Sequence, residues 1–177
     1  MGKTSQLKEE RSGLKKQSAE LMNSRQLEQC NAVIHTATAA SAAAGAIPIP
    51  VADAIPITAA QVTMVIALGR IFGVKITKGA ASTILTGVAT PIIGRTIASS
   101  FLKFIPIAGW IASAALAALI TEVIGWTVAV DFAKDYKRRE IIKEKENQHA
   151  EFVDAMDENE ILHENEDDIE DEIIKDI

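Results

Sequence analysis

The sequence predicts an all-α fold: a bundle of about four apolar helices, arranged as proline-punctuated helical hairpins, with a polar N-terminal arm and an acidic C-terminal tail. Three observations lead to this prediction. The middle of the 177-residue chain is apolar and rich in alanine, and residues 32–130 carry only seven formal charges. Proline and glycine divide that middle into runs long enough for helices. Both ends of the chain are dense in charge, which places them outside the core.

The chain is long enough for one substantial core, so we expect one apolar domain with flanking segments. It divides into a polar helical arm (1–28), an apolar helical domain (29–136), a charged helix extension (137–150) and an acidic tail (151–177) that we expect to be disordered. The net charge of -6 at pH 7 describes the tail and not the apolar domain. A nucleic-acid binder needs a basic face, so we expect no nucleic-acid partner. The single cysteine, Cys30, permits no internal disulfide.

The polar arm contains Leu7, Leu14 and Leu21 at heptad spacing, but no second apolar seam lies between them. A sustained coiled coil needs both seams. The pattern therefore predicts a surface helix or a partner-binding arm.

The apolar domain opens with a small-residue helix. Residues 26–45 are rich in alanine, and Gly45 stands where a helix commonly ends. Pro48 and Pro50 predict an extended turn. A new helix then begins with Asp53 in its first turn, where a carboxylate meets the positive end of the helix dipole favourably.

The next two helices each contain a proline. Pro56 either marks the start of its helix or kinks a helix that ends near Gly69 or Gly73. Residues 80–104 form the following helix, in which Pro91 allows either two shorter helices or one kinked helix. Proline thus punctuates the expected hairpins.

The longest apolar run, residues 104–131, predicts the central helix, with Pro106 at its start. Small side chains recur every four residues along it and form one ridge, against which another helix can pack closely. The ridge consists of Gly109, Ser113, Ala117, Thr121, Gly125 and Ala129. The other faces of the run are also apolar, which is typical of a core helix or of a membrane span.

Features at both ends of this run favour a membrane. Trp110 and Trp126 stand where interfacial aromatic residues would, and basic residues follow from Lys134 to Arg139. About twenty apolar residues suffice to cross a bilayer. Glu122 argues against a span, because an acid near mid-membrane is costly. On balance the tryptophans, the basic flank and the length of the run favour a membrane-associated chain with a transmembrane helix and charged termini on the cytoplasmic side. The alternative is a cytoplasmic bundle.

The sequence offers no pattern of catalytic, cofactor-binding or metal-binding residues. His35, His149 and His163 are scattered, and the last two lie in segments too polar to hold a preorganised metal site. The many acids of the tail lack the shielded cleft that acid–base catalysis needs. We therefore expect no enzymatic activity, no cofactor and no metal.

Two charges lie deep in apolar sequence, Arg95 and Glu122. We predict that they form a buried ion pair, because a lone buried charge is costly. Glu122→Ala would then leave Arg95 unpaired and lower the stability. A thermal melt that matches the parent would end this hypothesis.

Residues 33–136 resemble the family described as domain of unknown function 697 (DUF697). The resemblance rests on the small-residue first helix, the turn Ile47–Asp53 (IPIPVAD), Gln61 with its apolar helix, and Ile105–Gly109 (IPIAG) followed by an alanine-rich helix and Ile124-Gly125. A looser likeness exists to the helical parts of immunity-related GTPases.

The resemblance implies an all-helical module that is often joined to the C-terminal side of a small GTPase domain, is sometimes embedded in a membrane, and has no known activity of its own. This sequence shows no nucleotide-binding domain. The resemblance therefore implies a chain that acts alone, oligomerises, or works with a GTPase supplied by another chain.

Three functions remain open at this point. The favoured one is a non-enzymatic, membrane-associated helical module that acts with a separate GTPase. The alternatives are a soluble helical bundle for protein–protein interaction or oligomerisation, and a pore-forming or toxin-like protein that stays soluble until its hairpins insert. The expected partners are membrane lipid, a GTPase or another protein, and a second copy of the chain.

Overall fold

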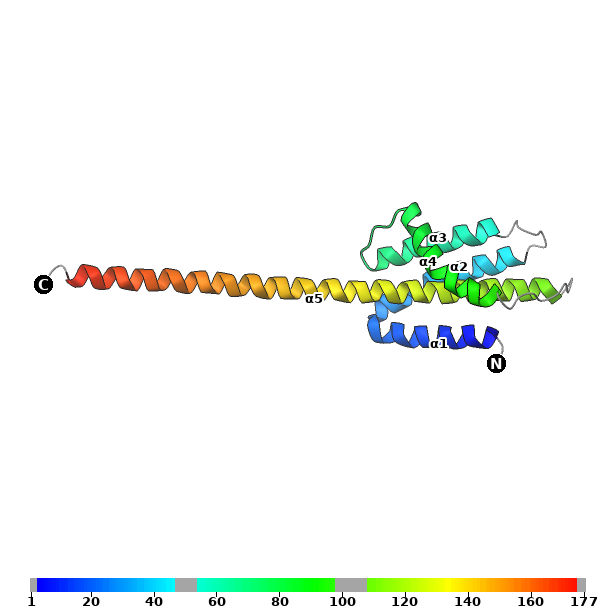
Figure 1. The fold of residues 1–177 in the computed structure, drawn as a ribbon, viewed down its shortest axis with the longest axis horizontal. Helices are drawn as coiled ribbons and strands as arrows, with labels where there is room; N and C mark the ends of the chain where they lie inside the picture. Colours follow the sequence, from blue (N-terminus) through cyan, green and yellow to red (C-terminus); the bar gives the residue numbers. More distant parts are fainter. Residues whose placement is uncertain (1–2, 47–53, 98–107, 175–177) are drawn as a thin grey trace. The chain divides into compact units, whose positions relative to one another are not determined.

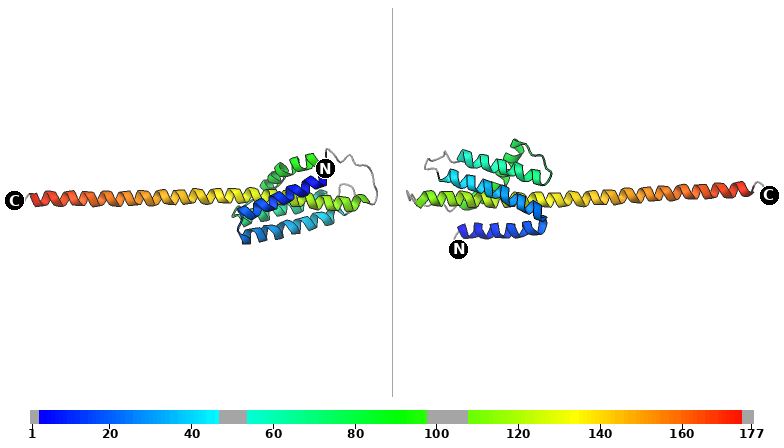
Figure 2. Two further views of the ribbon diagram at one scale, coloured as in Figure 1. Left: turned by 90° about the horizontal axis from the view of Figure 1, so that it is seen from below. Right: turned by 180° about the vertical axis from the view of Figure 1, so that it is seen from behind.

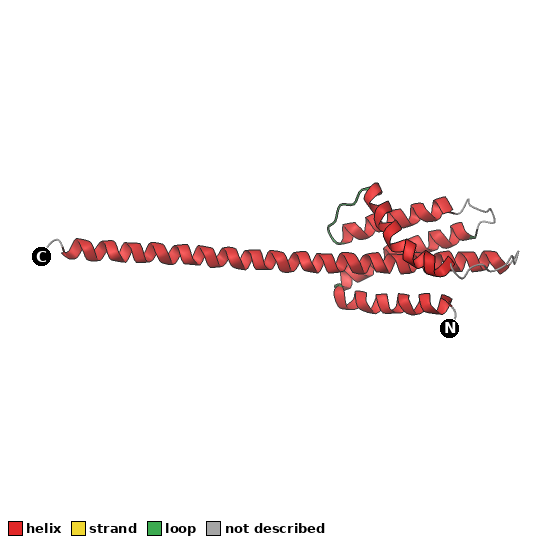
Figure 3. Cartoon of the chain, in the orientation of Figure 1, coloured by secondary structure: helices red, strands yellow, loops and turns green. Residues whose placement is uncertain are grey.

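The computed structural model describes residues 3–46, 54–97 and 108–174, with side chains for residues 4–46, 56–92, 114–153 and 156. These residues form helices joined by short connections, and no strand occurs among them (Figure 3). The all-α prediction is confirmed. The helices are α1 (Lys3–Leu21), α2 (Ser24–Gly45), α3 (Ala54–Ile71), α4 (Lys78–Ile97) and α5 (Ala108–Ile174).

The chain forms two units, Met1–Tyr136 and Lys137–Ile177. In the first unit, α1 to α4 lie around the N-terminal part of α5, and α1 and α3 are on opposite sides of it (Figures 1 and 2). Six consecutive residues of α5, 121–126, are buried. Successive residues of an α-helix point about 100° apart, so six in a row cover every face. This part of α5 is therefore the core helix of the bundle.

All five helices contribute apolar side chains to one core. Its largest fully buried side chains include Trp126, Phe72, Ile34, Met64 and Leu68. The ring of Phe72, just after α3, lies 6.4 Å from that of Phe132 and 6.3 Å from that of Tyr136, measured between ring centres. These tilted aromatic contacts fix the C-terminal end of α3 against α5.

The N-terminal arm is part of this bundle. Leu7 is buried, and Leu14 and Leu21 pack against the core. A capping box then separates α1 from α2: the Gln26 N–H donates to Asn23 Oδ1 at 2.8 Å, and the Asn23 N–H donates to Gln26 Oε1 at 3.1 Å. These bonds satisfy backbone donors that a helix start leaves unpaired, so they set the start of α2.

The ends of α3 follow from its proline and glycine residues. Pro56 lies in the first turn of α3, where its missing N–H removes no helical bond. At the other end, the Val74 N–H donates to the Gly69 carbonyl at 2.8 Å and the Gly73 N–H donates to the Arg70 carbonyl at 3.2 Å. Gly73 has a φ of 72°. This pair of bonds with a left-handed glycine is a Schellman motif.

Gly73→Ala is expected to lower the free energy of unfolding by about 1 kcal/mol, because a side chain disfavours the left-handed conformation that this cap requires. Urea denaturation followed by circular dichroism measures the change. Gly87→Ala in α4 is the matched control, because a Cβ there would meet nothing within 4 Å. The control should be neutral or stabilising. Equal behaviour of the two variants would contradict this role of Gly73.

Several predicted helix boundaries lie outside the described residues. These are the turn with Pro48, Pro50 and Asp53, and the helix start at Pro106. Pro91 is described, and α4 runs through it as one helix.

α5 continues from the first unit into the second and ends at Ile174. The predicted charged extension, 137–150, lies within it. For residues 151–177 the composition predicts a disordered tail, whereas the structure has helix through Ile174. The chain contains no glycine or proline after Gly125, and Glu, Ile and Lys are compatible with helix. No residue type in this segment therefore ends the helix, despite its high charge.

Candidate interaction surfaces

The small-residue ridge of α5 faces into the bundle. Thr121 and Ala129 are fully buried, and Gly125 is buried between them. A Cβ at Gly125 would lie 2.9 Å from both Ile34 Cγ1 in α2 and Met64 Sδ in α3. Both neighbouring helices therefore approach α5 at this glycine.

The N-terminal part of the predicted ridge is less enclosed or undescribed. Ala117 is half-buried. Gly109 and Ser113 belong to α5, but they precede the residues whose side chains are described.

A buried hydrogen bond joins α3 to the ridge. Gln61 Nε2 donates to Thr121 Oγ1 at 2.9 Å, and both side chains are buried. A buried polar group that loses its partner costs about 1–3 kcal/mol. This bond therefore favours one register of α3 along α5.

Glu122 is the centre of a charged cluster between α5 and α1. Its Oε2 accepts a hydrogen bond from Arg11 Nη1 at 3.1 Å, and its Oε1 lies 2.9 Å from Lys15 Nζ. The Glu122 side chain is 8% exposed, whereas those of Arg11 and Lys15 are 36% and 38% exposed. Each carboxylate oxygen thus has its own cation, and each cation still reaches water.

The pKa of Glu122 results from opposing effects. Burial raises the pKa of the carboxyl group, while the hydrogen bonds and positive charges of Lys15 and Arg11 lower it. The cations outweigh burial, so the pKa lies below its ordinary value. Glu122 is therefore ionised at neutral pH and binds α1 to the core helix.

The predicted partner of Glu122 was Arg95, whose side chain lies outside the described residues. The Arg95 pairing therefore stays a prediction. A loss of stability in Glu122→Ala is now expected from the contacts with Arg11 and Lys15 alone, so that variant no longer tests Arg95.

Sequence reasoning missed both cations, although the arm contains a signal for them. Arg11 and Lys15 are four residues apart, and Arg11 is also four residues from Leu7. In a helix such spacings share one face. One face of the arm helix therefore carries leucine and two cations. Such a face is complementary to an apolar helix that contains a single buried acid, as the run with Glu122 does.

Lys15 also contacts Trp126. Its Nζ lies 5.6 Å from the centre of a Trp126 ring, within the range of a cation–π contact. Trp126 lines a cavity of about 440 Å³ together with Lys15, Ser24, Leu27, Glu28 and Asn31. The buried Trp126 Nε1 has no hydrogen-bond partner among the described residues. The residues that line the cavity therefore include a tryptophan, a lysine and a glutamate.

Cys30 in α2 is fully buried, and burial raises the pKa of its thiol to about 12. Because the thiolate is the reactive form, Cys30 in the folded protein should react with Ellman's reagent at pH 8 about a thousandfold more slowly than in guanidinium. Absorbance at 412 nm follows the reaction. Equal rates in the two conditions would show that α2 is not packed as described.

A shallow groove runs between α2 and α3. Its volume is about 540 Å³, and nearly all of its lining side chains are small or apolar. Ala37 and Met64 are buried, while Ala40, Ala59 and Thr63 are exposed. The complete lining is Ala32, Val33, Thr36, Ala37, Ala40, Ala59, Ala60, Thr63, Met64 and Ala67.

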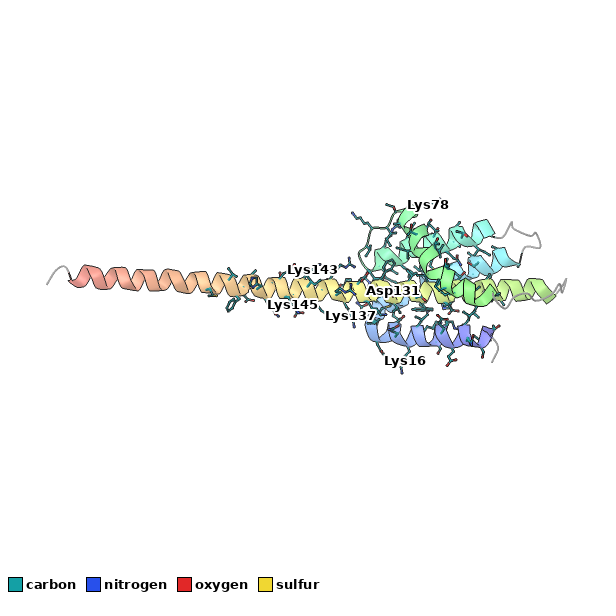
Figure 4. All side chains as sticks on the ribbon, in the orientation of Figure 1. Lys16, Lys78, Asp131, Lys137, Lys143 and Lys145 are labelled. Carbon is teal, nitrogen blue, oxygen red and sulfur yellow. The ribbon has the colours of Figure 1, made fainter. Side chains whose placement is uncertain are left out.

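Charge is scarce on the helices around this groove. Among the described side chains of residues 32–92, only Arg70, Lys75 and Lys78 have a formal charge. All three lie at the end of α3, in the connection, or at the start of α4, where Figure 4 labels Lys78. An ordinary soluble surface is about 25–35% charged. The α2–α3 surface is therefore suited to contact with another weakly polar surface.

The family comparison covers most of these elements. The model of the family described as Domain of unknown function (DUF697) matches residues 10–151. The chain belongs to the DUF697 family. No curated protein and no solved structure matches it significantly.

The DUF697 match is longer than the 33–136 span over which the sequence resembles the family. It includes Arg11 and Lys15 of α1 and both helices that line the groove. It also includes residues 137–151 of α5. The Glu122 cluster and the groove are therefore within the DUF697 region of this chain.

Proposed function

We propose that this DUF697 chain is a non-enzymatic docking module that binds an apolar helix of another protein in the groove between α2 and α3. The observation that carries the proposal is the groove itself: about 540 Å³, open, and lined by small side chains on a surface with few charges. Small residues allow helix backbones to approach closely. A partner helix with a row of larger apolar side chains would complement this groove.

The enclosed part of α5 supports this proposal, because it provides a rigid base for the groove. Met64 contributes to the groove and also contacts α5 at Gly125. Docking would therefore occur on preformed helices, which limits the ordering cost of binding.

The partner that we propose is a GTPase on a separate chain. The support is the resemblance to DUF697 modules that are joined to GTPase domains. Such a module could present the GTPase to a fixed location in the cell without any catalytic residues of its own.

Site-specific photocrosslinking tests this function. A benzoylphenylalanine at Thr63, in the groove, should crosslink to a GTPase in cells, whereas one at Ser12, exposed on α1, should not. Ala59→Arg should abolish the Thr63 adduct by placing an unpaired charge in the groove. Ser12→Arg is the matched control. The same adducts from both positions, or an adduct that survives Ala59→Arg, would contradict the proposal.

Membrane association is the second candidate, favoured by one observation. The helical segment Ala114–Val153 is long and apolar enough to cross a membrane, although more than half of its most apolar stretch is buried inside the bundle. A helix that serves as a core has the same composition as a span. In this candidate function, the charge-poor surface meets lipid and the charged termini stay on the cytoplasmic side.

Cell fractionation separates the two candidates. A docking module leaves the membrane pellet in alkaline carbonate, whereas an integral protein stays in it. Retention of the chain in the carbonate-washed pellet would replace the docking proposal with the membrane function.

A further inference from the structure

The exposed large apolar side chains among the described residues all lie on α5 in the second unit. They are Ile141, Ile142, Phe152, Val153 and Met156, and their exposed fractions range from 41% to 62%. The pairs 141–142 and 152–153 are eleven residues apart, which is about three helical turns, so they share one face. Clustered apolar side chains on one exposed face mark an interaction surface.

The spacing on this face is that of a short coiled-coil seam. Ile142, Phe152 and Met156 fall on the seam, with Lys145 and His149 between them. The steps between successive positions alternate between three and four residues, as the a and d positions of a heptad do. A second helix is therefore the kind of partner that fits.

The sign of the charge changes along the same segment, from basic at its N-terminal end to acidic at its C-terminal end. Residues 137–143 contain four Lys or Arg and one Glu, whereas residues 151–157 contain three Asp or Glu and no Lys or Arg. Figure 4 labels Lys137 and Lys143 in the basic part. Lys143 Nζ lies 3.5 Å from Glu140 Oε1, but both side chains are largely exposed. Such a surface pair contributes little, so it can be exchanged for an intermolecular one.

We propose that residues 137–157 of α5 pair with the same residues of a second copy of this chain in antiparallel orientation, centred on Asn147. This register places Ile142 of each copy opposite Phe152 of the other. It also places each basic segment, 137–143, opposite an acidic segment, 151–157. A parallel pair would place like charges opposite one another, which is unfavourable.

The occupant is a second copy because this segment is complementary to itself. Both apolar pairs and both charged segments are symmetric about Asn147. Lys145 and His149 form the central layers, and polar residues at such positions select one register at a cost in stability. The pairing is therefore specific and dependent on protein concentration.

Sedimentation equilibrium of the full chain tests the pairing. The parent should be a reversible dimer, and Phe152→Asp should raise the dimer dissociation constant about tenfold or more, because it places a carboxylate in the seam. Asn147→Asp is the matched control, since it adds the same charge on the opposite helix face. The control should leave the dimer nearly unchanged.

Disulfide trapping tests the orientation. Chains with Arg138→Cys and chains with Met156→Cys should form a crosslinked dimer when mixed and oxidised, because positions 138 and 156 are opposite in this register. Neither variant should crosslink efficiently by itself. The parent chain is the negative control, because its native Cys30 is fully buried and should form no crosslink.

Three results would overturn the proposal. They are a parent chain that stays monomeric at all concentrations, a dimer that Phe152→Asp leaves intact, and crosslinking of each cysteine variant with itself as in a parallel pair. All these substitutions lie in the second unit, outside the bundle. Their effect is therefore separable from any failure of the groove to bind a partner.

Discussion

Replacing both Arg11 and Lys15 with methionine is expected to lower the free energy of unfolding by about 3 kcal/mol at pH 7. The double variant keeps apolar stems of similar length but leaves the Glu122 carboxylate without either cation. The Glu122 side chain is 8% exposed, so water cannot replace both partners without moving α1 away from α5. Guanidinium denaturation monitored by circular dichroism measures the loss.

The matched control is a double variant with Lys8→Met and Lys16→Met. Both lysines are on α1 and exposed, so it removes the same charge from the same helix without touching Glu122. Its stability should change by less than about 0.5 kcal/mol. An equal loss in the two double variants would show that net charge, and not the Glu122 cluster, determines the effect.

The pH dependence gives a second readout of the same variant. In the parent, the lowered Glu122 pKa stabilises the fold above the ordinary carboxyl pKa, and this contribution is lost as the pH falls through the folded pKa. Without the cations, burial remains and raises the pKa, so the protonated form favours folding. The difference in stability between parent and variant should therefore be largest at pH 7 and shrink toward pH 4. A difference that is constant with pH would contradict this assignment.

Gly125→Ala is expected to lower the free energy of unfolding by about 2 kcal/mol. The added Cβ would lie 2.9 Å from Ile34 Cγ1 and 3.1 Å from Ile34 Cγ2, on a branched side chain that cannot turn away easily. Met64 Sδ is equally close but flexible. The strain exceeds the gain of about 1 kcal/mol that alanine brings to a helix interior.

Gly13→Ala in α1 is the matched control for Gly125→Ala. A Cβ at Gly13 would meet nothing within 4 Å, so only the gain in helix propensity remains. Thermal melts of both variants provide the comparison. If Gly125→Ala is as stable as Gly13→Ala, then α2 and α3 do not approach α5 as closely as described.

The helical class and the central position of residues 108–131, the described part of the apolar run, are predictable from sequence because they depend on local composition. An alanine-rich apolar run with no proline after its start has few alternatives to helix. The composition of this run does not predict whether lipid or other helices contact its surface. A lipid layer and four packed helices both accept a surface that is apolar all round, so the enclosure of Thr121 to Trp126 becomes evident only from the tertiary structure.

The Glu122 cluster was harder to predict because it joins residues that are 111 positions apart. The sequence predicts Arg95 as the partner of Glu122, because both charges lie in the apolar region. The two cations that lie beside Glu122 among the described residues come from the arm, whose polarity indicates a surface helix or a partner-binding arm. Gly73 and Asn23 act through local backbone geometry. The sequence indicates a helix end near Gly69 or Gly73, but it does not single out Asn23 as a helix start.

We assign residues 119–133 of α5 as the core helix of a bundle that is formed by the chain itself. Hydrogen exchange of the full chain, purified without detergent, tests it most directly. These backbone amides are expected to exchange slowest in the chain and to open only with global unfolding. Rapid exchange of residues 119–133 in aqueous buffer, with protection only after addition of lipid vesicles, would contradict it.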